Sequence, residues 1–188
     1  MKEIRIHGRG GQGSVTAAEL IAIAAFEDGK YSQALPAFGV ERRGAPVAAY
    51  VRLDDKPIRI RNQINFPDYV IVQDPTLIEV INVTGGLKIG GSILINSEKN
   101  PDYFAKKIGI EKNGVTIHTI DATRIALEYL GRPIVNTVLL GAFAAASGEI
   151  SAASLQRAAL ERFLGKLGEK NSHAIAITYE KMKEKEGS

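Results

Sequence analysis

Gly8-Arg9-Gly10-Gly11-Gln12-Gly13 follows a short apolar stretch at residues 4–6 and precedes an alanine-rich stretch, Val15–Phe26. This order predicts a strand, a glycine turn and a helix. Glycine lets the backbone adopt positive φ and approach a ligand closely, and the start of a helix points free N–H groups and a partial positive charge at the loop. The stretch therefore favours an anionic ligand, of which a phosphate-bearing molecule is the natural example.

Two common nucleotide-binding motifs fit this loop only in part. Gly8, Gly10 and Gly13 match G-x-G-x-x-G, which is followed about 20 residues later by an acid for the ribose hydroxyls. Tyr31–Pro36 contains no acid. In a Walker A loop a lysine would follow Gly13, but Ser14 stands there. The missing lysine disfavours an ATPase, and the missing acid disfavours a free-standing nucleotide-binding reductase. The alternative that the glycines only make a tight turn stays open.

Composition narrows the class of protein. The 188 residues, 45% of them hydrophobic, can bury one core, which predicts a single domain over residues 1–188. The chain has no cysteine to hold an iron–sulfur cluster, its three histidines lack metal-ligand spacing, and its net charge of +3 is too small to indicate nucleic-acid binding. No stretch approaches the roughly 20 apolar residues of a membrane helix. Since Met1-Lys2-Glu3 leads directly into a strand, we expect no signal peptide and a cytoplasmic protein.

Strands and helices are expected to alternate along most of the chain. Apolar runs predict buried strands at Tyr69–Val72, Ser92–Asn96 and Val115–Ile120. Start signals predict a helix after each of them: the capping box Thr76–Glu79, Asn100-Pro101 before Asp102–Ile108, and Asp121 before Ala122–Leu130. Three more helices are predicted at Pro133–Ala146, Ser151–Leu164 and about Ala174–Lys185.

An early β-hairpin completes the predicted fold. Pro46–Leu53 and Pro57–Arg61 flank the turn-like spacer Asp54–Lys56, so we expect these two segments to pair. Arg59 and Arg61 would then lie on the solvated face of an edge strand. The whole pattern predicts an α/β fold, a three-layer α/β/α domain with a mixed, largely parallel sheet.

A second informative run, Leu35–Pro46, carries paired arginines between glycines and prolines. Arg42 and Arg43 on a loop suit planar recognition of a carboxylate or a phosphate. A loop at a subunit interface, where they pair with Glu41 or with a neighbouring chain, fits equally well. Glu41 beside Arg42 favours a structural ion pair over a general base. No arrangement of residues indicates catalysis by this chain alone.

Together with the glycine loop, Phe38–Pro46 resembles the gamma subunit of pyruvate and related 2-oxoacid:ferredoxin oxidoreductases. The resemblance runs from Ile4 to about Leu164 and includes Asp74–Leu77 and Pro133–Thr137. It implies an enzyme that oxidatively decarboxylates pyruvate, or a related 2-oxoacid, with CoA to acyl-CoA, CO2 and reduced ferredoxin. It also implies partner alpha, beta and delta subunits that carry thiamine diphosphate, magnesium and the iron–sulfur clusters, with none of these bound by this chain alone.

The resemblance further implies a role for this chain in assembly and in binding CoA, the shared substrate. CoA carries a pyrophosphate and a 3′-phosphate, which a phosphate cradle and anion contacts would receive. The residues carried over to these roles are Gly10, Gly11, Gln12, Gly13, Arg42 and Arg43. Two alternatives remain, a purely structural scaffold subunit and an enzyme specific for branched-chain 2-oxoacids.

Overall fold

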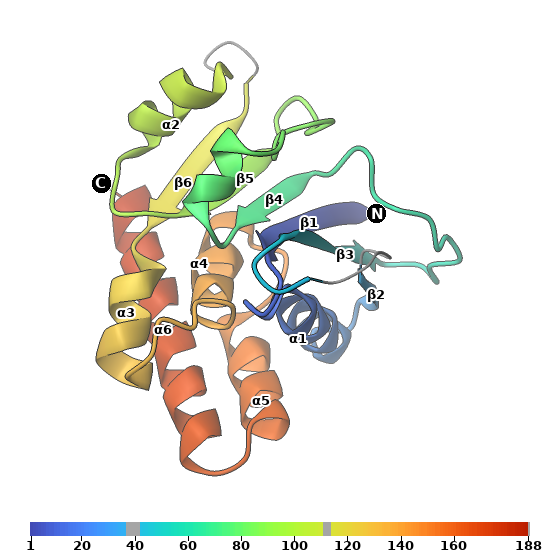
Figure 1. Cartoon of the computed structure of the whole chain (residues 1–188). Helices are drawn as coiled ribbons and strands as arrows, with labels where there is room; N and C mark the ends of the chain where they lie inside the picture. The colour runs from blue at the N-terminus through green and yellow to red at the C-terminus, as the bar shows by residue number, and fades with distance from the viewer. Residues whose placement is uncertain (37–41, 111–113, 188) are drawn as a thin grey trace.

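The computed structural model describes residues 1–36, 42–110 and 114–187, and in these residues six strands form one sheet with helices against both faces (Figure 1). The strands are β1 (Lys2–Arg9), β2 (Tyr31–Pro36), β3 (Pro46–Asp54), β4 (Tyr69–Val72), β5 (Ser92–Asn96) and β6 (Thr116–Ile120). The helices are α1 (Ser14–Glu27), the short 3-10 helix η1 (Pro75–Glu79), α2 (Pro101–Ile108), α3 (Ala122–Leu130), α4 (Val138–Ser147), α5 (Ala152–Arg162) and α6 (Lys166–Glu186).

The sheet is mixed and largely parallel, as predicted. Its strands lie in the order β2-β3-β1-β4-β5-β6, and β1, β4, β5 and β6 run parallel. Strand β3 is antiparallel to both of its neighbours, β1 and β2. The early hairpin therefore exists, but the prediction of its strands was wrong: β2 pairs with β3, whereas residues 57–61 form no strand. Because β1 and β2 occupy both edges of β3, no edge is left for residues 57–61.

Two apolar cores, one on each face of the sheet, confirm the three layers. On β1, Ile4 and Ile6 join the larger core with α1 and α3 to α6. On β4, Val70 and Val72 join the smaller core, which includes Leu77 of η1 and residues of α2. Alternate residues of a strand point to opposite faces, so the two isoleucines and the two valines lie on opposite sides of the sheet. Figure 1 shows α2 on one side and α1 with α4 to α6 on the other.

Three of the predicted helix starts are confirmed by their caps. The side chains of Asn100, Asp121 and Ser151 accept the backbone N–H groups of Tyr103, Arg124 and Ser154, at the starts of α2, α3 and α5. The first helix ends as predicted before Gly29, where φ is +85°. These signals are local, which explains why the sequence alone reveals them.

Three other predicted starts were wrong. The cap of η1 is Asp74 rather than Thr76, because the Asp74 carboxylate accepts the Thr76 N–H at 3.0 Å. Helix α4 begins at Val138, five residues later than predicted. Helix α6 begins at Lys166, eight residues earlier than predicted, and buried Asn171 in its second turn accepts the Thr137 hydroxyl. Tertiary contacts thus override a weak local pattern.

The two edge strands of the sheet, β6 and β2, differ in the charged side chains that lie along them. At one edge, Lys185 of α6 donates to the carbonyl oxygen of Thr119 in β6 at 3.1 Å. At the other edge lies β2, whose residues Tyr31–Pro36 include no charged side chain. Within the part of the chain that the structure describes, no helix combines the length and apolar character needed to cross a membrane.

Candidate functional site

The glycine loop lies at the carboxyl end of β1, next to the end of β4. The connection after β1 leads through α1 on the face of the larger core, and the connection after β4 leads through η1 on the opposite face. In open α/β sheets, ligands bind outside the carboxyl ends of the strands at the point where the connections change face. The topology therefore puts the predicted loop at a favoured ligand position.

Helix α1 begins in this loop without a side-chain cap. Its N-cap is Gly13, which has φ +76° and no side chain to accept a hydrogen bond, and Gly11 has φ +94°. The first N–H groups of a helix have no partner inside the helix. A loop of this kind offers those N–H groups and the partial positive charge of the helix to an anion.

Buried carboxamides pack closely against the glycines. A Cβ at Gly8 would collide with the side-chain oxygens of Gln73 and Ser14, and a Cβ at Gly13 would collide with the Asn136 carboxamide. Gln73 follows β4 directly, and Asn136 precedes α4. A larger residue at either position would have to displace these buried side chains, which favours glycine there.

A charged network connects the ends of β1 and β4. Asp74 accepts hydrogen bonds from Arg9 Nε at 2.9 Å, from Gln12 Nε2 at 3.2 Å and from the Thr76 hydroxyl at 2.6 Å. Burial on its own would raise the pKa of Asp74, but the hydrogen bonds from Thr76, Gln12 and Arg9 outweigh burial and hold the pKa below its usual range. The network fixes Arg9 and Gln12, so it also fixes the conformation of the glycine loop.

The β2–β3 connection brings the two arginines to the glycine loop. Gly10 donates to the Ala45 carbonyl at 2.9 Å and accepts from the Gly44 N–H at 3.0 Å, and it forms a parallel bridge with Arg43. Arg42 and Arg43 are both exposed. The structure therefore brings together the predicted residues of the two motifs.

Part of the second motif lies outside the described residues. This applies to Phe38–Glu41, and with them to the predicted ion pair between Glu41 and Arg42.

Sequence patterns did not identify four residues of this site, Arg9, Gln73, Asp74 and Asn136. For Gln73 and Asp74 a signal existed, because they directly follow the predicted buried strand Tyr69–Val72 and the carboxyl ends of parallel strands share one edge of the sheet. Asn136 lies in the run Pro133–Thr137 that the resemblance includes, but nothing in the sequence indicates its contact with Gly13, 123 positions away.

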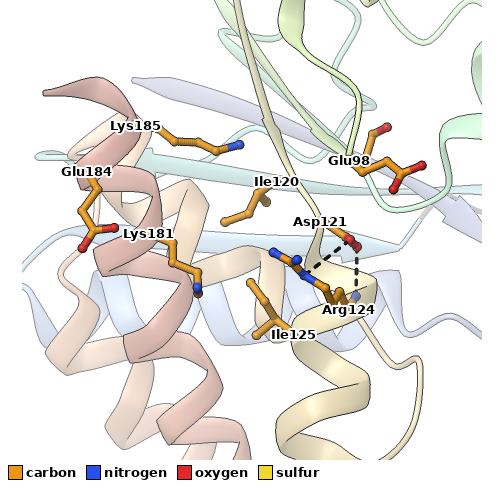
Figure 2. Close-up of a pocket in the computed structure, with 9 residues that line it drawn as sticks. Glu98, Ile120, Asp121, Arg124, Ile125, Lys181, Glu184 and Lys185 are labelled. Carbon is orange, nitrogen blue, oxygen red and sulfur yellow. Dashed lines mark hydrogen bonds and ion pairs between the residues drawn. The ribbon is translucent and has the colours of Figure 1, made fainter. Parts of the chain in front are cut away.

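A cavity of about 610 Å³ lies farther along the same edge, at the carboxyl ends of β5 and β6. Figure 2 shows side chains of both signs around it, with Arg124 and Asp121 from the start of α3 and Lys181 and Lys185 from α6. Arg124 Nε lies 3.8 Å from Asp121 Oδ2. No group of three or more potential metal ligands occurs among the residues described. The mixed charge gives this cavity no preference for an anion.

Comparison with known proteins identifies the family. The family model described as pyruvate ferredoxin/flavodoxin oxidoreductase matches residues 3–181. The chain belongs to this family. The resemblance to its gamma subunits, first noted in the two motifs, is confirmed by relatives that match along nearly the whole chain.

Two relatives in this oxidoreductase family illustrate the similarity. The pyruvate synthase subunit PorC of Methanothermobacter marburgensis is 57% identical over 183 residues, which cover 97% of this chain and 98% of the relative. The pyruvate/ketoisovalerate oxidoreductases common subunit gamma of Thermococcus kodakarensis is 54% identical over 181 residues, which cover 96% of this chain and 97% of the relative.

Solved structures show the same fold in the oxidoreductase family. The pyruvate oxidoreductase subunit PORC of Thermotoga maritima has a TM-score of 0.83 and 35% identity, with 95% of each chain covered. The 2-oxoglutarate:ferredoxin oxidoreductase of Magnetococcus marinus, solved with 2-oxoglutarate, coenzyme A and succinyl-CoA bound, has a TM-score of 0.76 and 19% identity. The match covers 98% of this chain and 31% of that longer chain, and at 19% identity it shows the fold alone.

Proposed function

We propose that this chain is the gamma subunit of a pyruvate, or related 2-oxoacid, ferredoxin oxidoreductase, and that it contributes to CoA binding through the glycine loop and Arg42 and Arg43. The observation that carries the proposal is the juxtaposition of two motifs. The bridge between Gly10 and Arg43 brings the backbone of two exposed arginines beside the glycine loop, in which α1 starts without a side-chain cap. Backbone N–H groups at a helix start and guanidinium groups are the two kinds of donor that phosphate groups prefer.

The phosphates of CoA fit this pair of donors. Its pyrophosphate would lie on the N–H groups of the loop, and its 3′-phosphate would be within the range of long, exposed arginine side chains. The backbone of Gly10, Gly11, Gln12 and Gly13 forms the proposed cradle. The conformation of the cradle is already fixed by Arg9 and Asp74, which lowers the entropic cost of ordering the loop on binding.

The redox chemistry belongs to other subunits in this proposal. The chain contains no cysteine, so it cannot supply the thiolates that hold iron–sulfur clusters. We assign the clusters, the thiamine diphosphate and the magnesium ion to the partner alpha, beta and delta subunits, and ferredoxin is the electron acceptor of the assembled enzyme. The chain's own share is to bind CoA phosphates and to hold the loop that presents them.

A branched-chain 2-oxoacid is the second candidate substrate of the enzyme. The Thermococcus kodakarensis relative is a subunit common to pyruvate and ketoisovalerate oxidoreductases. A subunit that binds CoA rather than the 2-oxoacid can serve both reactions, because CoA is common to them. Assays with pyruvate and with ketoisovalerate distinguish the candidates once the partner subunits are chosen.

Co-expression with candidate alpha, beta and delta subunits tests the proposal. The measurement is 2-oxoacid-dependent viologen reduction, with and without CoA, in complexes with and without this chain. We expect activity to require both CoA and the chain. A complete complex that turns over equally well without the chain would overturn the CoA role and leave a scaffold subunit.

A further inference from the structure

Gln73 occupies a central position at the strand ends. Its backbone N–H donates to the His7 carbonyl at 2.9 Å, and its backbone oxygen accepts from Asn96 Nδ2 at 3.0 Å. Its side-chain oxygen accepts from the Ser14 hydroxyl at 2.8 Å. These bonds connect Gln73 to β1, β5 and α1, and its carboxamide lies beside the glycine loop.

One polar atom of this side chain remains without a partner. Gln73 is 2% exposed, and its Nε2 forms no hydrogen bond with any residue that the structure describes. Buried donors without a partner are rare in proteins, and they occur at sites where a missing ion, water or ligand completes the bonding. The unpaired donor belongs to a carboxamide whose oxygen lies against Gly8 and is bonded to Ser14, the first residue of α1.

The side chain of Gln12 also lies beside Gly8. Its Oε1 is 3.4 Å from the position that a Cβ on Gly8 would take, and the Gln73 carboxamide adjoins that position as well. Gln12 Oε1 accepts the backbone N–H of Arg9 at 2.8 Å. The side-chain oxygen of Gln12 thus accepts a hydrogen bond from a backbone N–H of the loop. A phosphoryl oxygen bound to the loop would accept a hydrogen bond of the same kind.

We propose that Gln73 is a further ligand-binding residue, and that a phosphoryl oxygen displaces the Gln12 carboxamide and accepts a hydrogen bond from Gln73 Nε2. The inference rests on the proposed function and specifies the phosphoryl group as the part of CoA held at this loop. Displacement vacates the position of Gln12 Oε1 beside Gly8, and the incoming oxygen satisfies the Gln73 donor. The bond between the Ser14 hydroxyl and Gln73 Oε1 does not use Nε2, so it is retained when the ligand binds.

Three variants of the assembled complex test this inference. Gln73→Met has a similar shape and no donor. Ser14→Ala is its matched control, because it also loses the bond between Ser14 and Gln73 but keeps Nε2. Gln12→Ala removes the competing carboxamide. Calorimetry measures the affinity of each for CoA and for pantetheine, which has no phosphate, and thermal unfolding checks the fold.

We expect Gln73→Met to weaken CoA binding at least ~10-fold, as for a hydrogen bond to a charged group, and to leave pantetheine binding unchanged. Ser14→Ala is expected to keep CoA affinity within about twofold, and Gln12→Ala to bind CoA more tightly. If Gln73→Met fails to fold, Gln73→Leu, which also lacks the donor and adds no charge, is measured in its place with the same expectation.

Wild-type CoA affinity in the Gln73 variant would overturn this inference and leave the proposed function standing. Equal losses for CoA and pantetheine would also overturn it, since they indicate general damage to the site. Weaker CoA binding by Gln12→Ala would contradict the displacement. A wild-type complex in which this chain adds nothing to CoA affinity would overturn the proposed function and this inference together.

Discussion

Asn136 Nδ2 donates to the carbonyl oxygen of Gly13 at 3.3 Å and so joins the segment before α4 to the N-cap of α1. Asn136 is 6% exposed, and its carboxamide occupies the space that a side chain at position 13 would need. The glycine loop is therefore shaped by a residue far away in the sequence. The dimensions of the site depend on how α4 packs, as well as on the loop itself.

Gly13→Ala should destabilise the protein more than a glycine substitution that meets no neighbour. An alanine at φ +76° costs about 1–2 kcal/mol in backbone strain, and its Cβ would in addition collide with Asn136. Gly29→Ala is the matched control, because Gly29 has φ +85° and no atom lies near the Cβ position. Urea unfolding measures both. Equal losses in free energy of unfolding would contradict the close packing of Asn136.

Replacing Arg42 and Arg43 together by alanine should raise the KM for CoA about tenfold or more without changing kcat, because exposed guanidinium groups would bind phosphate before the chemical steps begin. The control is Arg59→Ala, an exposed arginine outside the site. Steady-state kinetics of the assembled complex gives both constants. A weaker complex with an unchanged KM would instead support the scaffold alternative.

Asp74→Asn should reduce stability by about 1 kcal/mol at neutral pH, since it removes the ion pair with Arg9 and weakens the cap of η1. The pKa of Asp74 is held below its usual range, so its contribution is complete above about pH 4 and is lost as the pH falls through the lower, folded value. Chemical unfolding across pH 2–7 checks this. The variant should lose less stability than the wild type at the acid end.

His7 should make the fold sensitive to mild acid. Burial, and then the charge of Arg5, lower the pKa of His7 from 6.5 to about 4. Between these values the unfolded chain takes up a proton that the folded chain refuses, so stability decreases as the pH falls from 6.5 to 4, by roughly 3 kcal/mol at most.

His7→Gln should flatten this slope, because glutamine can still accept the hydrogen bond from Arg5 Nε but does not titrate. Unfolding free energies at pH 7, 5.5 and 4 give the measurement. Asp74→Asn serves for comparison, because the change that it removes falls at lower pH. An unaltered slope in the His7 variant would show that another group is responsible.

Local signals account for what the sequence predicted correctly. The β1–loop–α1 unit and the caps at Asn100, Asp121 and Ser151 depend on neighbouring residues, so they could be recognised without a structure. The pairing of β2 with β3 could not be recognised from the sequence, because it depends on which strands lie on either side of β3. The early start of α6 was also hidden, since its first turns include Gly168 and Asn171, which packing stabilises.

The two motifs of the site could be predicted from the sequence, but the contacts between distant residues that join them could not. The glycine loop and the arginine pair each carry a recognisable composition, and the structure joins them through Gly10 and Ala45. The carboxamide of Asn136 reaches the loop only through tertiary packing, and no spacing in the sequence indicates that contact. The assignment of these residues to CoA stays a prediction.

The lack of charged side chains on the edge strand β2 has a consequence for producing the protein in soluble form. An open strand edge without charged side chains offers its backbone N–H and C=O groups to any similar strand, and proteins commonly guard such edges with lysine or proline. Tyr31–Pro36 has only the terminal proline for this purpose. Overproduction of this polypeptide by itself should consequently give concentration-dependent aggregates, and soluble yield should improve when its synthesis is slow or is matched to that of the other subunits.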